Sequence, residues 1–396
     1  MKIALIAACD RNNYGDILLP YITKRFIMSQ VSADKKIYFD YFALSHADLT
    51  SVGGKITEPL FEMDDKYEAI IVSGGEVMSA RYWNMLMNLE LVGAKRVCRL
   101  FNHRFESRLR EMVARMILNG KSIMPWIVSD RFSCPIFYNS VSGYQAISNK
   151  RGRKAWEDCI FKAALFSVRD EKCLMAIKED NSSLDVQLVP DTAILMDSLF
   201  SSNELNEKMS KDNKKIFDTI DSYYVIQCNY RYGKDLADDI VDAINLIFEE
   251  TSIMCVLLPI GRAKGHEDQL ILKTIKDRLD NDRCVLVANN NIYETMNIIK
   301  KSICFIGTSL HGIVTASAYE VPHTLLTHKA EKTYSYMCTW ESTSMLCCES
   351  PSDIAKFIIS GAYNQSVLKD SIKKMKQYAY DYMNQEFDEI VRRYDE

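Results

Sequence analysis

The segment Ile303–Pro322 carries the residues best suited to acid–base chemistry in this chain. Its first four residues are apolar and predict a buried strand, which Gly307 ends. Thr308 and Ser309 are of the kind that caps a helix, so we expect a helix to begin near His311. The N–H groups at such a helix start attract anions, and a histidine there can act as an acid or a base near neutral pH. A plain capping or packing histidine is the alternative interpretation.

Two polar turns follow expected strands in the first half of the chain. The first strand leads into a loop that contains Asn13, Gly15 and Asp16, and this loop can bind a polar ligand at the start of a helix. A later buried strand runs into Gly74 and Gly75, and paired glycines let a ligand or another backbone approach closely. A capping turn and a tight turn, respectively, are the competing interpretations.

Cationic residues also occur at expected strand ends. Arg169 follows a strand, and its planar guanidinium can bind a carboxylate or phosphate. Alternatively it pairs with Asp170 or another neighbour and only holds the turn in place. A second turn, residues 259–268, contains Arg262, Lys264 and His266, which is more charge than a connecting loop requires.

The composition of the 396 residues is that of a globular protein, and it excludes several classes. The net charge of −4 gives no support for nucleic-acid binding. Twelve cysteines without a C-x-x-C pair indicate no zinc site and favour a reducing cytoplasm. No apolar run approaches the roughly 20 residues of a membrane span. The arginine-rich amphipathic helix expected at residues 95–118 can lie on anionic lipid or bind an anionic acceptor, or it can simply face the core with a solvated basic side.

Strands and helices alternate in both halves of the chain, which predicts an α/β fold with two Rossmann-like, doubly wound parallel sheets. The first domain is expected at residues 1–200 and the second at 222–350. A polar segment at 201–221 is interpreted as the linker, and 351–396 as C-terminal helices.

Six turns occur in an order that is similar to that of a known family. They are N-x-G-D at Asn13–Asp16, the glycine pair Gly74-Gly75, S-V-R-D at Ser167–Asp170, V-P-D at Val189–Asp191, the G-H-E-D-containing turn Leu258–Asp268, and I-G-T-S-L-H-G at Ile306–Gly312. Across roughly residues 3 to 326 this pattern resembles the polysaccharide pyruvyl transferase family. The resemblance implies a GT-B-like pair of domains that face each other across a cleft. It also implies transfer of the enolpyruvyl group of phosphoenolpyruvate to a sugar of a cell-surface polysaccharide or its precursor, which leaves a pyruvate ketal and phosphate.

The resemblance also implies roles for individual residues. His311 matches the family's catalytic histidine, and Arg169 matches an arginine that contacts phosphoenolpyruvate. Ser309 departs from the pattern, because the commonest form has arginine two residues before the histidine. Further residues expected on the donor side are Thr308, Ser309, Leu310, Gly312, Arg231, Arg262 and His266, and those expected to face the acceptor are Asn13, Gly15, Asp16, Gly74 and Gly75.

Two other functions remain open at this point. The missing arginine favours a GT-B glycosyltransferase that uses a nucleotide sugar, and a catalytically silent binding or scaffold protein is a third hypothesis. The expected partners are phosphoenolpyruvate and a glycan or lipid-linked glycan, with no nucleic acid. No metal or other cofactor is expected, and the expected location is the cytoplasm, with peripheral membrane contact as a variant.

Overall fold

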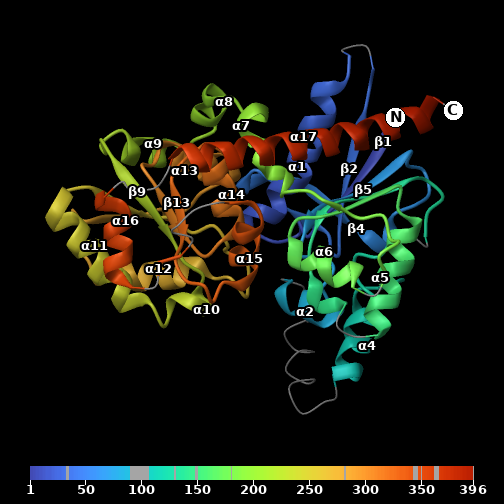
Figure 1. Ribbon diagram of the computed structural model, residues 1–396, viewed down its shortest axis with the longest axis horizontal. Helices are drawn as coiled ribbons and strands as arrows, with labels where there is room; N and C mark the ends of the chain where they lie inside the picture. The colour runs from blue at the N-terminus through green and yellow to red at the C-terminus, as the bar shows by residue number, and fades with distance from the viewer. Residues whose placement is uncertain are drawn as a thin grey trace. The chain divides into compact units, whose positions relative to one another are not determined.

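The structure, a computed structural model, describes residues 1–32, 35–89, 107–128, 131–147, 150–179, 181–280, 282–341, 347–348, 350–360 and 365–395. The chain divides into two compact units. The N-terminal unit comprises residues 1–192 together with 378–396, and the C-terminal unit comprises residues 193–377. Figure 1 shows the elements of both units, with most helices and several strands labelled.

The N-terminal unit is built on an eight-stranded sheet in the order β3-β4-β2-β1-β5-β6-β7-β8. Every pair in this sheet is parallel except β3 with β4. The strands are β1 (Lys2–Ile6), β2 (Tyr38–Ala43), β3 (Ala47–Asp48), β4 (Ile56–Pro59), β5 (Ala69–Gly75), β6 (Ile136–Val141), β7 (Leu165–Val168) and β8 (Gln187–Leu188). The helices are α1 (Tyr14–Gln30), α2 (Tyr82–Asn88), α4 (Ser107–Ile117), α5 (Lys150–Lys162), α6 (Glu171–Lys178) and the second part of α17 (Gln365–Asp395).

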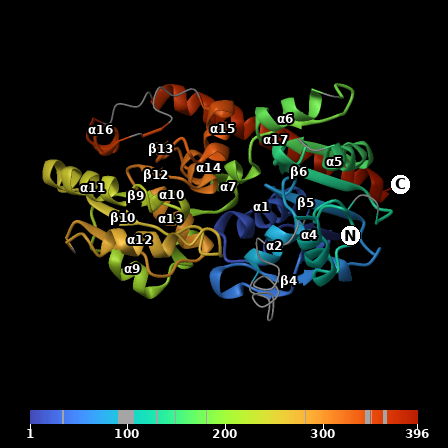
Figure 2. The same cartoon turned by 90° about the horizontal axis from the view of Figure 1, so that it is seen from below.

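Helices cover both faces of this sheet. Side chains of α2, α4, α5 and α6 form one apolar core with the strands, in which Trp156 stacks edge-on against Tyr138. Figure 2 shows α5 and α6 next to β6. On the other face, Ile27 of α1 and Ile390 of α17 pack against Ile3 of β1 and its neighbours. The central strands are apolar along their length because both of their faces are buried.

The C-terminal unit has a five-stranded, all-parallel sheet in the order β11-β10-β9-β12-β13. Figure 1 shows α11 and α12 on one side of this sheet and α8 and α13 on the other. The strands are β9 (Tyr223–Gln227), β10 (Met254–Leu257), β11 (Cys284–Leu286), β12 (Phe305–Gly307) and β13 (His323–Leu325). The helices are α7 (Met196–Leu199), α8 (Ser202–Glu207), α9 (Lys211–Phe217), α10 (Tyr230–Gly233), α11 (Ala237–Thr251), α12 (Asp268–Lys276), α13 (Ile292–Lys301), α14 (Leu310–Ala318), α15 (Glu331–Trp340), α16 (Pro351–Ser360) and the first part of α17.

The prediction of two doubly wound α/β units is confirmed, but the observed boundaries differ from the predicted ones. The first unit ends at 192 instead of 200, and the predicted linker 201–221 contains helices α8 and α9, each capped by a serine. The C-terminal helices are not a separate part, because α16 packs on α11 and α17 is shared between the units. Of the helix predicted at 95–118, the structure describes α4, Ser107–Ile117, and residues 95–106 lie outside the described part. None of the helices in the described ranges has the length and apolar character that a membrane span requires.

One acidic side chain of α17 lies inside the N-terminal unit. Glu386 is 1% exposed, and neither of its carboxylate oxygens has a hydrogen-bond partner among the described residues. Tyr382, one turn earlier, donates to the backbone oxygen of Tyr138 at 2.9 Å and so fixes the helix against β6. Burial raises the pKa of Glu386 to about 8.

We predict that Glu386→Gln stabilises the protein increasingly as pH rises. From the usual glutamate pKa of 4.5 up to about 8, the folded state keeps a proton that the unfolded state releases. This difference lowers the free energy of unfolding by about 1.4 kcal/mol per pH unit in the wild type but not in the variant. Urea denaturation at several pH values measures the effect.

The control is Glu389→Gln on the same helix, where the side chain is paired with Arg392 and Arg393 near solvent. Its pKa is lowered by those hydrogen bonds, so no gain that grows toward pH 8 is expected. A Glu386→Gln curve that runs parallel to the wild-type curve across this range would contradict the prediction.

Candidate active site

His311 lies in the first turn of α14, directly after β12. Ser309 has an extended backbone (φ −83°), and its Oγ accepts a hydrogen bond from the Gly312 N–H at 3.3 Å. Ser309 is therefore the N-cap residue, as its position in the sequence predicts. His311 is half-buried, as is Ser309, whereas Leu310 between them is buried.

The turn before α14 is held by the side chain of Gln227, the last residue of β9. The Gln227 Oε1 accepts from the Thr308 N–H at 2.9 Å and from the Ser309 N–H at 2.8 Å. In the first turn of the helix itself, the Gly312 N–H has the Ser309 hydroxyl as its acceptor. The sequence analysis expected N–H groups at this helix start to attract an anion, but those of Thr308, Ser309 and Gly312 already have acceptors within the protein.

Gln227 in turn is held by Asp268, the first residue of α12. Its Nε2 donates to Asp268 Oδ2 at 2.7 Å, and the same oxygen accepts from the N–H groups of Ile260 and Gly261 at 2.9 and 2.8 Å. The other oxygen, Oδ1, is buried and has no hydrogen-bond partner among the described residues. Burial raises the pKa of the Asp268 carboxyl to about 6, and the hydrogen bonds to Oδ2 limit the rise.

Gly307 and Gly312 leave the space that the side chains of Gln227 and Phe305 occupy. A Cβ on Gly307 would lie 2.7 Å from the Phe305 ring and 2.9 Å from Gln227 Oε1, so a side chain there would displace the amide. A Cβ on Gly312 would lie 2.3 Å from the same ring. The structure thus explains both glycines by close packing inside the unit.

Asn229 gathers several of the predicted residues at the same edge of the sheet. Its N–H donates to Thr308 Oγ1 at 3.1 Å, and its Nδ2 lies 3.3 Å from His266 Nδ1. Its Oδ1 accepts from the Arg231 N–H, which places the exposed Arg231 at the start of α10. Asn229 therefore joins Thr308, His266 and the backbone of Arg231, whose guanidinium lies over the Tyr232 ring at 5.6 Å. The sequence analysis did not single out Asn229 as a linking residue.

Arg262 is directed elsewhere. Its guanidinium donates to Asn290 Oδ1 at 2.8 Å and to the Val287 backbone oxygen at 3.2 Å, so it holds the end of β11. The other two cations of these turns, Arg231 and Lys264, are exposed, whereas Arg262 is half-buried in this packing role. The donor-side role of Arg262 remains a prediction that its hydrogen bonds do not favour.

Arg169, in the N-terminal unit, is buried and ion-paired. It is 2% exposed, and its Nη1 donates to Asp191 Oδ2 at 2.9 Å. Asp170 instead caps α6 by accepting from the Cys173 N–H at 2.9 Å, and it also accepts from the Ser142 hydroxyl at 2.6 Å. The V-P-D and S-V-R-D motifs are therefore joined directly. This geometry matches the alternative in which Arg169 holds its turn, and its contact with phosphoenolpyruvate remains a prediction.

The residues expected on the acceptor side lie at the carboxyl edge of the N-terminal sheet. Asn13 precedes α1 and donates to Asp16 Oδ2 at 2.7 Å, and Gly15 is buried in the first turn. Gly74 and Gly75 end β5 with φ of 75° and 90°, a conformation that favours glycine, so the backbone itself requires both.

The sequence analysis missed a buried network beside these residues. Asp10 accepts two bonds from the Arg11 guanidinium, at 3.0 and 2.8 Å, through Oδ1. Its Oδ2 accepts from the N–H and the hydroxyl of Ser45, both at 3.1 Å. Because Ser45 follows β2 and Asp10 follows β1, the network joins two neighbouring strand ends. Only the 35-residue separation of the two partners hid it from sequence reasoning.

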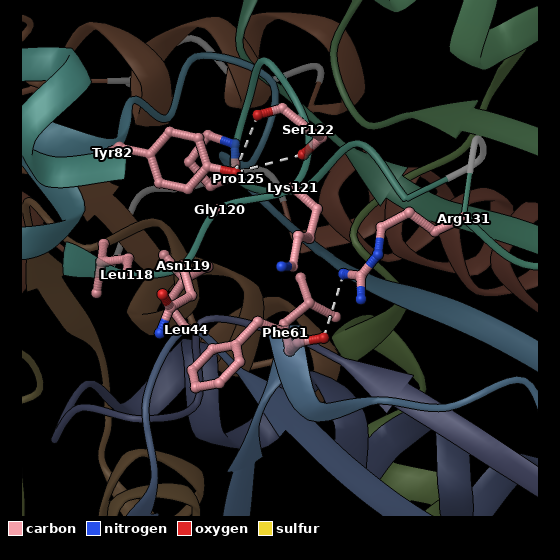
Figure 3. Close-up of a pocket in the computed structure, with 11 residues that line it drawn as sticks. Leu44, Phe61, Tyr82, Leu118, Asn119, Gly120, Lys121, Ser122, Pro125 and Arg131 are labelled. Atoms are coloured by element: carbon pink, nitrogen blue, oxygen red, sulfur yellow. Dashed lines mark hydrogen bonds between the residues drawn. The ribbon is translucent and has the colours of Figure 1, made fainter. Parts of the chain in front are cut away.

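A crevice near α2 does not hold a sugar in this conformation. Its cavity of about 10 Å³ has room for about one water molecule. Figure 3 shows Tyr82 reaching toward Ser122, to whose backbone oxygen its hydroxyl donates at 3.3 Å. The cations Lys121 and Arg131 line the same crevice. Within the described ranges, no group of three or more His, Cys, Asp and Glu side chains is placed to hold a metal ion.

Comparison with solved structures defines the class of fold. The chain is similar to UDP-GlcNAc 2-epimerases from Methanocaldococcus jannaschii (11% identity, 96% of this chain and 100% of that chain, TM-score 0.53) and from Neisseria meningitidis (10%, 99% and 100%, TM-score 0.52). It is also similar to the N-terminal domain of Candida albicans trehalose-6-phosphate phosphatase (10%, 99% and 98%, TM-score 0.50). At these identities the likeness shows the fold alone, which is of the GT-B type.

The family follows from the sequence itself. Residues 13–329 match the family described as polysaccharide pyruvyl transferase, and the chain belongs to that family. It is thus a transferase of the class that acts on polysaccharides. A search of curated proteins gives no match.

We predict that Arg169→Ala destabilises the N-terminal unit by about 3–5 kcal/mol, because it removes the guanidinium that pairs with the buried Asp191 carboxylate. Equilibrium urea denaturation measures the loss. In the control Arg169→Met/Asp191→Leu, both charges are removed, and most of the stability is expected to return. An Arg169→Ala variant as stable as the wild type would show that the ion pair does not hold this turn.

Proposed function

We propose that the protein moves the pyruvyl group of phosphoenolpyruvate to a glycan, free or lipid-linked, and forms a pyruvate ketal with release of phosphate. The observation that carries this proposal is a half-buried histidine on a capped helix start, at the carboxyl edge of a parallel sheet, in a chain of this family. At that position an imidazole can exchange protons with a bound substrate near neutral pH.

The chemistry assigned to His311 is delivery of a proton. Protonation of the methylene carbon of phosphoenolpyruvate makes the central carbon electrophilic, and a sugar hydroxyl adds to it and loses its own proton. A second hydroxyl of the same sugar then displaces phosphate from that carbon, which closes the ketal. The overall change forms one C–H bond and two C–O bonds, and it breaks the C=C π bond, the C–O bond to phosphate and two O–H bonds. One hydroxyl proton balances the proton delivered to the methylene carbon, the other leaves with phosphate, and no oxidant or reductant is required.

The charge of the donor suits the residues that are gathered around the helix start. Phosphoenolpyruvate carries a carboxylate and a phosphate, so its site needs cations and N–H or O–H donors. Arg231 is exposed at the start of α10, and Asn229 links that start to Thr308 and His266. Ser309 retains a hydroxyl hydrogen to donate, because its Oγ acts as the acceptor in the cap.

A nucleotide-sugar glycosyltransferase is the second candidate, and Ser309 is the observation that favours it. The cap carries no positive charge at the position where the family pattern has arginine. Thermal denaturation discriminates between the candidates, because a ligand that binds only the folded state raises the melting temperature. A rise with phosphoenolpyruvate and none with UDP-GlcNAc supports pyruvyl transfer, and the reverse result supports the glycosyltransferase. If neither ligand raises it, the catalytically silent binding protein is favoured.

We predict that His311→Gln lowers the rate of phosphate release from phosphoenolpyruvate with a glycan acceptor by about 10²–10⁴-fold, because the variant cannot deliver the proton. Phosphate release and the mass of the glycan are followed together. The control is His46→Gln, an exposed histidine near Glu58 in the N-terminal unit, which is expected to react at the wild-type rate. Near-normal turnover by His311→Gln would rule out the assigned role.

A further inference from the structure

The two strand ends joined by Gln227 meet where the order of the sheet reverses. From β9 the chain proceeds to β10 and β11 on one side of the sheet, and it later returns to β12 on the other side of β9. At such a point the loops leave the two neighbouring strands in opposite directions, and ligands bind in the crevice between them. Gln227 and Gly307 are register partners here, and each is the last residue of its strand.

The orientation of the Gln227 amide is determined by its partners. The N–H groups of Thr308 and Ser309 can only donate, so the carbonyl oxygen must face them. The amide NH₂ therefore points the other way, toward the Asp268 oxygen that also accepts from Ile260 and Gly261. One buried side chain thus joins the ends of β9 and β12, the loop after β10 and the start of α12.

We propose that Gln227 and Asp268 are positioning residues that hold the start of α14, and with it His311, in its place at the sheet edge; the inference rests on the function proposed above. Gln227 is 1% exposed and Asp268 is fully buried, so their contribution is made through the turn and not by touching a substrate. Asp268 fixes Gln227, and Gln227 fixes the turn that precedes His311.

Loss of this network is expected to change the position of the Thr308–Ser309 turn. Without the Gln227 oxygen, the N–H groups of Thr308 and Ser309 must find other acceptors, and the turn shifts to reach them. A displacement of about 1 Å at a reacting group can lower a rate by about 10²-fold. A shift in the turn is therefore expected to affect kcat more than the KM for phosphoenolpyruvate.

The experiment follows the His311 ring directly, by the NMR signal of its imidazole C–H protons in the full-length protein. The spectrum of His311→Gln lacks this signal, so comparison with the wild-type spectrum identifies it. Gln227→Met removes both ends of the amide bridge, and Gln227→Asn keeps an amide that is too short to span them. Asp268→Asn keeps an oxygen acceptor at the place of Oδ2, and Asp268→Leu removes it.

A matched control is Asn213→Leu in the same unit. Asn213 is a buried amide that donates to Asn289 O at 2.9 Å and to Glu294 Oε1 at 2.7 Å, and none of its hydrogen bonds reaches the Thr308–Ser309 turn. Its loss is expected to lower the melting temperature and leave the His311 signal unchanged. The control separates displacement of the turn from general destabilisation.

The expected result is a displaced His311 signal and a kcat lower by about 10- to 100-fold in both Gln227 variants and in Asp268→Leu. Asp268→Asn is expected to keep the wild-type signal. Two Gln227 variants are compared so that failure of one to fold still leaves the test complete. A wild-type signal and kcat in either Gln227 variant, or an equal displacement in Asn213→Leu, would overturn the proposal.

The same data separate this proposal from the proposed function. If the wild-type protein releases no phosphate from phosphoenolpyruvate, pyruvyl transfer is wrong, and the NMR signal alone decides the positioning role. If turnover is normal but the signal does not respond to Gln227, the positioning role is wrong and pyruvyl transfer stands.

Discussion

The hydrogen bonds of the Gln227 side chain are the constraint on which the candidate site depends. They join residues 81 and 82 positions apart in the chain, the end of β9 and the turn before α14. A buried parallel sheet leaves polar groups at its carboxyl edge that must be satisfied inside the protein. Here one amide and one carboxylate, Gln227 and Asp268, satisfy four backbone N–H groups among them. Once that network is formed, the place of His311 is set.

In the N-terminal unit, charged side chains hold the polar strand ends at the carboxyl edge of the sheet. Arg169 pairs with Asp191 across strand ends β7 and β8, and Asp10 joins the ends of β1 and β2 through Arg11 and Ser45. Several residues whose type suggested ligand binding are therefore occupied in holding strand ends. In the C-terminal unit, Arg231 is exposed and His311 is half-buried as a residue, with its Nε2 atom inside the protein.

The sequence predicted much of the fold because most strands are continuous apolar runs and the helices alternate with them. It predicted a cap at Thr308 or Ser309, of which Ser309 is the N-cap, since capping depends on neighbours only three residues apart. It missed the strands β3 and β4, which are two and four residues long, and the serine-capped helices in the predicted linker. It could not find the partner of Gln227, because a bond across 41 residues, to Asp268, leaves no periodic pattern. The available signal was Gln227 itself, a polar residue at the end of the apolar strand β9. A polar side chain buried at such a position needs a hydrogen-bond partner.

The central claim is that His311 delivers a proton to the methylene carbon of phosphoenolpyruvate during transfer to a glycan. The most direct measurement is the reaction in D₂O, followed by the mass and the proton NMR spectrum of the product glycan. The account predicts a pyruvate ketal whose methyl group carries a single deuterium from solvent. A ketal methyl without deuterium, or a glycan that gains a sugar from a nucleotide sugar and no pyruvate, would contradict it.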